Sequence, residues 1–378
     1  MIPFNKPYLT GKETHYIYDA VNSGKISGNG KYTQKCQSFF EEKYGFKKTL
    51  LTTSCTDALE MCAILANIQP GDEVIVPSFT FVSTAIAFVR QGAKIVFADS
   101  YSDNPNIDAN QIEKLVTDKT KAIVPVHYAG VACDMDRIME IADKYNLLVI
   151  EDAAQAIDSF YIGKNGKKVA LGSIGHMAAF SFHETKNIIS GEGGMLAIND
   201  DRFIHRAEII WEKGTNRAEF FRGEVNKYGW VDTGSSFLPS EVIAAFLWAQ
   251  IENLDFIQSK RLKIWNTYKA RLGEWAFKKN IILPNVPNYA TNNAHMFYLT
   301  CENIEQRTNI ISRLKESNIL SVFHYISLHS SPYNKSVNDE EIDLVNSDKY
   351  TNCLLRLPFY CELDENQLDF TISKIIEI

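Results

Sequence analysis

Short apolar strands alternate with amphipathic helices from about residue 49 onward, and this alternation constrains the fold more than any other feature. Near-continuous runs of valine, isoleucine and alanine between helices are typical of a mainly parallel sheet that helices cover on both faces. The predicted strands lie at 50–53, 73–77, 93–100, 121–130 and 147–156, and the predicted helices at 81–92, 108–116 and 134–146. The sequence therefore predicts an α/β fold.

The pattern changes near residue 250. Residues 241–275 are predicted to form one long helix, because apolar residues recur there at three- and four-residue steps. The prolines of segment 283–288 end it, and the remaining predicted elements are strands at 294–300 and 320–325 and a helix at 305–318. We expect a large domain over residues 1–250, including the N-terminal segment, and a smaller α+β domain over residues 251–378.

Charge and cysteine content exclude several classes of function. A net charge of −7 argues against binding to nucleic acid or to an anionic membrane surface. Seven cysteines without a CxxC pair predict neither a metal site nor a disulfide framework. The N-terminus lacks the pattern of a secretion signal, and no apolar run reaches the roughly 18 residues that span a bilayer. We expect a cytoplasmic protein with reduced thiols.

Three predicted strand ends carry residues suited to chemistry, and ligands collect at such ends in doubly wound sheets. The first is TTSCTDAL, residues 52–59, in which small hydroxyl residues lead into a helix. The unpaired N–H groups and the dipole of a helix N-terminus favour an anion. Plain N-capping by Ser54 or Thr56 explains the same residues equally well.

The second strand end carries two acids, Glu151 and Asp152, directly after the apolar run LLVI. A carboxylate at that depth has to be paired or hydrogen-bonded, because burial of a bare charge is costly. It is either an N-cap of the next helix or the counter-ion of a ring nitrogen bound in the crevice. Gln155, one helical turn later, would face in the same direction.

The third strand end is AAFSFHETKNIISGEGGM, residues 178–195, which places Lys186 between two apolar segments and five residues after Ser181. An ordinary lysine, with a pKa of about 10.4, is almost fully protonated at pH 7. Burial lowers that pKa and makes the amine a nucleophile, and an aldehyde would bind it as a Schiff base. The alternative is a surface lysine whose charged head reaches solvent.

Together the three ends offer an anion site, a carboxylate and a lysine, which a pyridine aldehyde phosphate requires. The chain resembles the DegT/DnrJ/StrS family of sugar-nucleotide aminotransferases. The resemblance lies in five motifs and their order along the chain: TSCTDAL, PSFTFVSTA, EDAAQA, FSFHETKN and GEGGM. The similarity runs from the N-terminal IPFNKPYLTGKE to the end of the chain. It implies the aspartate-aminotransferase fold (fold type I), pyridoxal 5'-phosphate (PLP) as cofactor, and a homodimer whose active sites are shared between subunits.

The resemblance also implies roles for individual residues. Lys186 matches the catalytic Schiff-base lysine and Asp152 the partner of the pyridine nitrogen. The other implied cofactor contacts are Gln155 at the ring hydroxyl, Thr56, Asp57 and Ser181 at the phosphate, Phe81 stacked on the ring, and Ser235 and Ser236 from the second subunit. The candidate substrate contacts are His183, His324, His329 and, in a predicted irregular loop near the site, Lys213, Arg217, Arg222 and Lys227. For the histidines and the charged loop, a purely structural role is the alternative.

The implied activity is transfer of an amino group from L-glutamate to C4 of a nucleotide sugar, dTDP-4-dehydro-6-deoxy-D-glucose. An aminotransferase that acts at C3, or on another nucleotide-linked keto sugar, would need the same cofactor residues. A PLP-dependent lyase or dehydratase is disfavoured, because relatives of the dehydratase kind replace the lysine with histidine and this chain keeps Lys186. A non-catalytic regulator is disfavoured because every expected cofactor position is filled.

Overall fold

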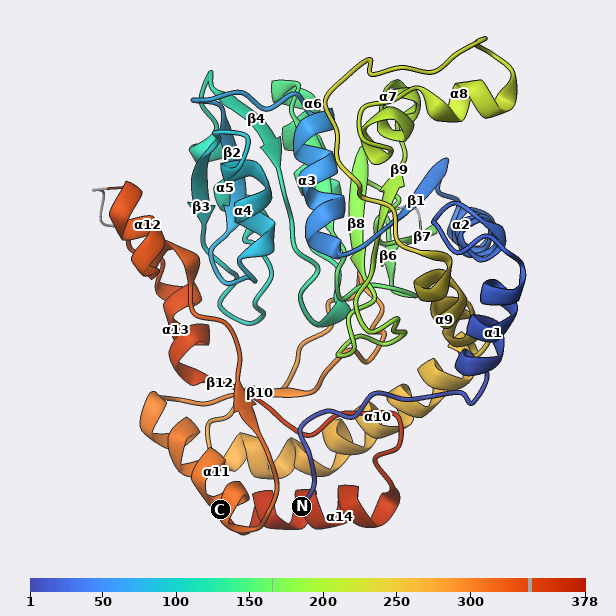
Figure 1. Cartoon of the computed structure of the whole chain (residues 1–378). Coiled ribbons are helices and arrows are strands. Elements are labelled where there is room, and N and C mark those ends of the chain that lie inside the picture. Colours follow the sequence, from blue (N-terminus) through green and yellow to red (C-terminus); the bar gives the residue numbers. More distant parts are fainter. Residues whose placement is uncertain (165, 339–341) are drawn as a thin grey trace.

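The apolar strand segments pair into one seven-stranded sheet, which forms the centre of the large domain (Figure 1). The structure, a computed structural model, describes residues 1–164, 166–338 and 342–378. In spatial order the strands are β1 (Lys48–Thr52), β9 (Gly194–Ile198), β8 (Met177–Ser181), β5 (Leu148–Asp152), β4 (Thr120–Ile123), β2 (Glu73–Pro77) and β3 (Lys94–Ala98). All strands from β8 to β3 are parallel, and β9 runs antiparallel to both of its neighbours.

Helices cover both faces of this sheet, because successive residues of each strand point to opposite sides. In β2, Ile75 packs in one core cluster and Val74 and Val76 pack in the other. The first cluster includes α2 (Lys31–Tyr44), α5 (Ala109–Leu115), α6 (Met135–Tyr145) and α9 (Glu241–Ile251), and the second includes α3 (Cys55–Leu65), α4 (Ser83–Val89) and α7 (Asp201–Trp211). The predicted mainly parallel sheet, covered on both faces, is confirmed.

Several predicted elements differ from the structure. The strand predicted over 121–130 is shorter, because β4 ends at Ile123. The single helix predicted over 241–275 is wrong, because α9 ends at Ile251 and α10 (Leu254–Lys278) begins after Asn253. The backbone of Asn253, with φ −110° and ψ 12°, is not helical, although the apolar spacing continues across the joint. The predicted irregular loop after α7 contains a short helix, α8 (Arg217–Arg222).

The small domain is built on a three-stranded antiparallel sheet, ordered β10 (Tyr298–Thr300), β12 (Leu354–Arg356) and β11 (Val322–Phe323). One core cluster joins this sheet to α10, α11 (Ile304–Glu316) and α14 (Glu365–Ile376), at the bottom of Figure 1. Tyr16, Ile17 and Ala20 of the N-terminal segment pack in the large-domain core, but the first residues of the chain pack in this small-domain cluster. Ile2 is buried in the same cluster and forms a parallel bridge with Ile319.

A segment of the small domain returns to the large one and fixes the two to each other. It contains α12 (Pro332–Val337) and α13 (Val345–Cys353), on the β3 side of the sheet in Figure 1. The Asp99 carboxylate, just after β3, accepts hydrogen bonds from the N–H groups of Asn346 and Ser347 at 3.1 and 2.8 Å. Such charge-assisted hydrogen bonds are strong, so this contact helps to hold the small domain against the ends of the strands. None of the helices that the structure describes is long and apolar enough to cross a membrane.

Candidate active site

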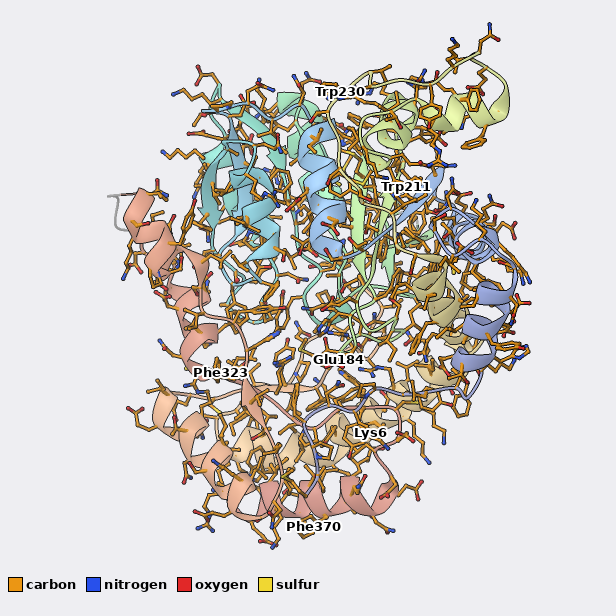
Figure 2. All side chains as sticks on the ribbon, viewed as in Figure 1. Lys6, Glu184, Trp211, Trp230, Phe323 and Phe370 are labelled. Atoms are coloured by element: carbon orange, nitrogen blue, oxygen red, sulfur yellow. The ribbon has the colours of Figure 1, made fainter. Side chains whose placement is uncertain are left out.

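A cavity of about 590 Å³ lies where the carboxyl ends of the parallel strands meet the small domain. Glu184 lies three residues after the end of β8, and its label in Figure 2 shows where the ends of the strands face the small domain. The large-domain wall includes the start of α3, the end of β5 and the loop after β8, and the small-domain wall includes 295–296, 324–325 and 356. The three strand ends predicted from the sequence therefore converge on one space.

The start of α3 forms one wall of the cavity, called here the anion-binding wall because its donors suit an anion. Ser54 is the N-cap, and its hydroxyl accepts a hydrogen bond from the Asp57 N–H at 3.1 Å. Thr56 lines the cavity instead, with its hydroxyl 2.7 Å from that of Ser83. Cys55 and Thr56 are the first residues of α3, so their N–H groups have no partner within the helix. This end of the cavity is suited to a phosphate.

Gly194 lets the strand β9 pass close to the start of α3. A Cβ at Gly194 would lie 2.4 Å from the backbone of Ser54 and Cys55, nearer than any Cβ atom packs. Glycine is therefore required, because it alone has no Cβ. This close passage explains the last glycine of GEGG and brings the loop that carries Lys186 beside the anion-binding wall.

Of the two acids at the end of β5, only Asp152 lines the cavity. Its Oδ2 accepts a hydrogen bond from Thr84 Oγ1 at 2.7 Å, and its Oδ1 accepts one from the Ala154 N–H at 3.1 Å. Burial raises the pKa of the Asp152 carboxyl above its ordinary value, and both hydrogen bonds oppose that rise. The carboxylate is thus held in place for a ligand that carries a positive charge.

Glu151 has a structural role. Adjacent residues of a strand face opposite sides, so its fully buried side chain points away from the cavity. It accepts hydrogen bonds from the N–H groups of Gly172, Ile174 and Gly175 and pairs with His127 Nε2 at 2.8 Å. This carboxylate fastens the turn that precedes β8.

Lys186 lies in the loop between β8 and β9, and its side chain lines the cavity. Its Nζ forms no hydrogen bond with any residue that the structure describes. Burial lowers the pKa of this amine below its ordinary value, against the opposing charges of Cys55 and Asp152. An unpartnered amine with a lowered pKa is a nucleophile.

Gln155 is held between the two domains. Its Oε1 accepts a hydrogen bond from the Ala129 N–H at 2.6 Å, and its Nε2 donates to Tyr325 Oη at 3.0 Å. The backbone donor fixes which way the amide points, so Nε2 lies on the cavity side with a second N–H to donate.

These groups fit pyridoxal phosphate. The start of α3 offers N–H and hydroxyl donors to the phosphate, Asp152 a carboxylate to the protonated ring nitrogen, and Lys186 an amine to the aldehyde. The fit depends above all on an unpartnered lysine and a buried carboxylate that share one cavity.

The small-domain wall holds residues that the sequence analysis missed, chiefly His295, Tyr325 and Arg356. His295 Nδ1 is 2.9 Å from Asn187 Oδ1, and burial lowers its pKa well below the ordinary value. The predicted His324 also lines the cavity, with its Nδ1 2.6 Å from a tyrosine hydroxyl. Burial likewise lowers the pKa of His324, so both rings are neutral hydrogen-bonding groups at pH 7.

Other predicted contacts divide into two groups. Phe81, Ser181 and His183 line the cavity, and the Phe81 ring lies 6.1 Å from that of Tyr325. Asp57 and His329 lie outside it. The Asp57 carboxylate accepts a hydrogen bond from the Thr53 hydroxyl. The buried His329 ring has its Nδ1 2.7 Å from the Ser78 hydroxyl.

The segment after α7 lies far from the cavity of its own chain, against the expectation of a loop near the site. Figure 2 shows Trp230, which belongs to this segment, at the opposite end of the large domain from Glu184. Lys213, Arg217 and Ser236 line a different, second cavity. The predicted residues of this segment that line no part of the first cavity are Lys213, Arg217, Arg222, Lys227, Ser235 and Ser236.

The whole chain matches one family of known proteins. The model of the DegT/DnrJ/EryC1/StrS aminotransferase family covers residues 7–376. The chain belongs to this family. Among curated DegT-family relatives, it is 33% identical to the spore coat polysaccharide biosynthesis protein SpsC of Bacillus subtilis, over 100% of this chain and 97% of that protein. It is 31% identical to GDP-perosamine synthase of Caulobacter vibrioides, over 98% and 96% of the two chains.

Solved structures confirm the predicted DegT-family fold. One of them is the PMP-form of 'putative sugar aminotransferase Spr1654' from Streptococcus pneumoniae. It superposes with a TM-score of 0.90 at 24% identity, and the match covers 100% of this chain and 98% of that one. Its PLP-form superposes with a TM-score of 0.88. The expected cofactor, PLP, is therefore the one that structural neighbours of this DegT-family chain carry. They carry it in the aldehyde form (PLP) and in the amine form (PMP).

Proposed function

We propose that the protein transfers an amino group from L-glutamate to C4 of dTDP-4-dehydro-6-deoxy-D-glucose, giving dTDP-4-amino-4,6-dideoxy-D-galactose and 2-oxoglutarate, with PLP as cofactor. One observation carries this proposal. The unpartnered amine of Lys186, the buried carboxylate of Asp152 and the start of α3 meet in a single cavity. Transamination with PLP uses these three groups together.

Each residue has a defined task in this reaction. PLP supplies the electron sink for the negative charge that forms when an amino acid loses its α-proton. Asp152 keeps the ring nitrogen protonated, which strengthens that sink. Lys186 takes the α-proton of glutamate and later returns a proton to the sugar carbon, because a neutral amine is a proton acceptor and its lowered pKa favours that form. Overall, the nitrogen moves from glutamate to C4, the keto oxygen of the sugar leaves as water, and the keto oxygen of 2-oxoglutarate comes from water.

The sugar substrate is supported by two similarities. A relative 31% identical is named GDP-perosamine synthase, and perosamine is an amino sugar. Segments 212–250, 293–299 and 322–332 resemble dTDP-4-amino-4,6-dideoxygalactose transaminase. We take the second resemblance as the guide to the nucleotide and the ring position.

We also propose that the protein acts as a homodimer with shared sites. Trp230 is 85% exposed in the single chain, and exposed large apolar side chains are typical of interfaces when they cluster. Val231 and Tyr228 beside it are exposed as well. In the dimer, Ser235 and Ser236 reach the phosphate in the partner's cavity. The cations of the same segment reach the nucleotide diphosphate, and His183 and His324 contact the sugar.

The GDP-perosamine synthase relative favours one alternative, a GDP-linked keto sugar as acceptor. One experiment separates the two. The protein is incubated with PLP, L-glutamate and either the dTDP-linked or the GDP-linked keto sugar, and the product is analysed by NMR. An amine at C4 in the galacto configuration on the dTDP sugar supports the proposal. Amination at C3, amination of the GDP sugar alone, or absence of 2-oxoglutarate contradicts it.

A matched pair of variants ties the activity to the site. Among the described residues, Lys186 is the only lysine that lines the cavity, so Lys186→Ala should abolish turnover. Lys278→Ala removes an exposed lysine that pairs with Glu274 on α10, so turnover should be retained. Activity of Lys186→Ala equal to that of the parent protein would refute the assignment.

A further inference from the structure

We propose that Cys301 and Cys353 form a reversible disulfide when the protein meets a peroxide, which makes this pair an oxidative modification site in the small domain. Both cysteines are free thiols in the structure. Cys301 directly follows β10 and Cys353 directly precedes β12, so they lie at the same end of two paired strands. This inference goes beyond the proposed function and does not depend on it.

The register of the two strands places the cysteines opposite each other. Thr300 pairs with Leu354, so the next pair in the antiparallel register is Cys301 with Cys353. The Cys301 N–H donates a hydrogen bond to the Cys353 carbonyl at 2.8 Å, and the pairing therefore continues to these residues. In a hydrogen-bonded antiparallel pair the two Cα atoms lie about 5.5 Å apart. A disulfide joins Cα atoms about 4.4–6.8 Å apart, so this backbone spacing permits the bond.

Both side chains point to the same face of the sheet. Alternate residues of a strand share a face, and Cys301 lies in the small-domain core cluster together with Leu299, two residues earlier. Cys353 lies in the same cluster together with Leu355, two residues later. Leu354, between them in the sequence, packs in a different cluster. Side chains directly opposite on one face of a sheet are neighbours, so the two thiols lie side by side.

The two thiols have no hydrogen-bond partner, in contrast to other buried cysteines of the chain. The Sγ atoms of Cys36 and Cys133 donate hydrogen bonds to backbone carbonyl groups at 3.5 and 3.2 Å. Within the described part of the chain, the sulfur atoms of Cys301 and Cys353 have no such acceptor. Oxidation of this pair therefore breaks no hydrogen bond of the folded protein.

Two cations favour ionisation of Cys353, which makes it the thiol that reacts first. Burial raises the pKa of the Cys353 thiol, and the charges of Lys349 and Arg307 oppose that rise. Lys349 lies one helical turn earlier on α13, and Arg307 Nη1 donates a hydrogen bond to the Thr351 carbonyl at 2.8 Å. Cys353 is also 6% exposed, against 1% for Cys301, so a small oxidant reaches it more readily. Thiolate character and access decide which cysteine is oxidised.

Oxidation by hydrogen peroxide balances in two steps. The Cys353 thiolate attacks one peroxide oxygen and the O–O bond breaks, which leaves a sulfenic acid on Cys353 and, with the proton that the thiol has lost, one water. The Cys301 sulfur then attacks the sulfenic sulfur. The S–S bond forms, the S–O bond breaks, and the hydroxyl leaves as a second water with the Cys301 proton. The two sulfur atoms lose two electrons in total and the peroxide oxygens gain them, and a dithiol reverses the bond.

The test exposes the reduced full-length protein to equimolar hydrogen peroxide, unfolds it in urea with N-ethylmaleimide to block the remaining thiols, and analyses the digest by mass spectrometry. The number of blocked thiols should fall by two from the seven of the chain. The missing pair should appear as one linked peptide that contains Cys301 and Cys353 and that dithiothreitol separates. Cys301→Ser should leave Cys353 as a sulfenic acid that dimedone labels, whereas Cys353→Ser should give no dimedone adduct on Cys301.

Cys361→Ser is the matched control. Cys361 is a buried cysteine of the same domain with a similar exposure of 8%, and it should leave the disulfide between Cys301 and Cys353 unchanged. In the parent protein, the loss of no thiol, a disulfide between other cysteines, or oxidation of Cys353 to a sulfinic acid without a disulfide would overturn the inference. Because the pairing is read in the parent protein, this outcome does not depend on how well the variants fold.

Discussion

Removing the hydroxyl of Thr84 should shift the pH range over which the protein binds its cofactor. Thr84→Val keeps the shape of the side chain but deletes the 2.7 Å hydrogen bond to Asp152 Oδ2. That hydrogen bond opposes the rise that burial causes in the pKa of Asp152, so the variant raises the pKa further. The ionised carboxylate pairs with the protonated ring, and therefore cofactor binding is present above this pKa and is lost as pH falls through it.

The size of the effect follows from the strength of the lost contact. A hydrogen bond to a charged group contributes about 1.5–3 kcal/mol. Because one pH unit corresponds to about 1.4 kcal/mol, the acid midpoint of binding should move up by about one to two pH units. Pyridoxamine phosphate is the probe to use, because it binds without reacting with Lys186. Its Kd is measured by titration across pH.

A double-mutant cycle isolates the Thr84–Asp152 contact. In the Asp152→Asn background the titrating group is absent, so Thr84→Val should no longer shift the acid midpoint. The pKa of the ligand's own phosphate is the same in all four proteins and cancels in the comparison. The reasoning would be refuted if binding had the same acid midpoint in the parent protein and in Thr84→Val. It would also be refuted if Thr84→Val still shifted the acid midpoint in the Asp152→Asn background.

Three further outcomes are expected. Gly194→Ala should destabilise the protein by about 1–3 kcal/mol and weaken cofactor binding, because its Cβ would lie 2.4 Å from backbone at the start of α3. Gly273→Ala, in open space within α10, should stabilise it slightly, and urea unfolding titrations of both variants measure the two effects. Glu151→Gln should cost about 3–5 kcal/mol, because a buried carboxylate with four partners loses its charge. Asp152→Asn should lower the pKa of Lys186 further, since it removes a charge that raises it. The pH at which a trinitrobenzenesulfonate probe labels Lys186 in the cofactor-free protein should fall accordingly.

The sequence predicted the large domain well because its signals are local. Apolar strands and helix caps involve neighbouring residues, as at α5, where the Asp108 side chain accepts a hydrogen bond from the Asn110 N–H. Helix joints are less visible. The break at Asn253 lies in its backbone angles and leaves the apolar spacing intact.

The site residues that directly follow a predicted strand could be predicted from the sequence. Lys186, Asp152 and Thr56 follow strands that run in the same direction in one sheet, and the carboxyl ends of such strands share an edge. Arg356 carries no comparable signal. It lies 170 residues beyond Lys186 in the sequence, and only the packing of the small domain over the strand ends brings the two to one cavity.

The most direct measurement of the central claim is chemical. The protein is incubated with PLP, reduced with borohydride, digested and analysed by mass spectrometry. If the unpartnered amine beside Asp152 binds the cofactor aldehyde, the reduced pyridoxyl adduct will lie on Lys186 and will be absent from Lys186→Ala. An adduct on another lysine, or bound cofactor that leaves Lys186 unmodified, would contradict the account.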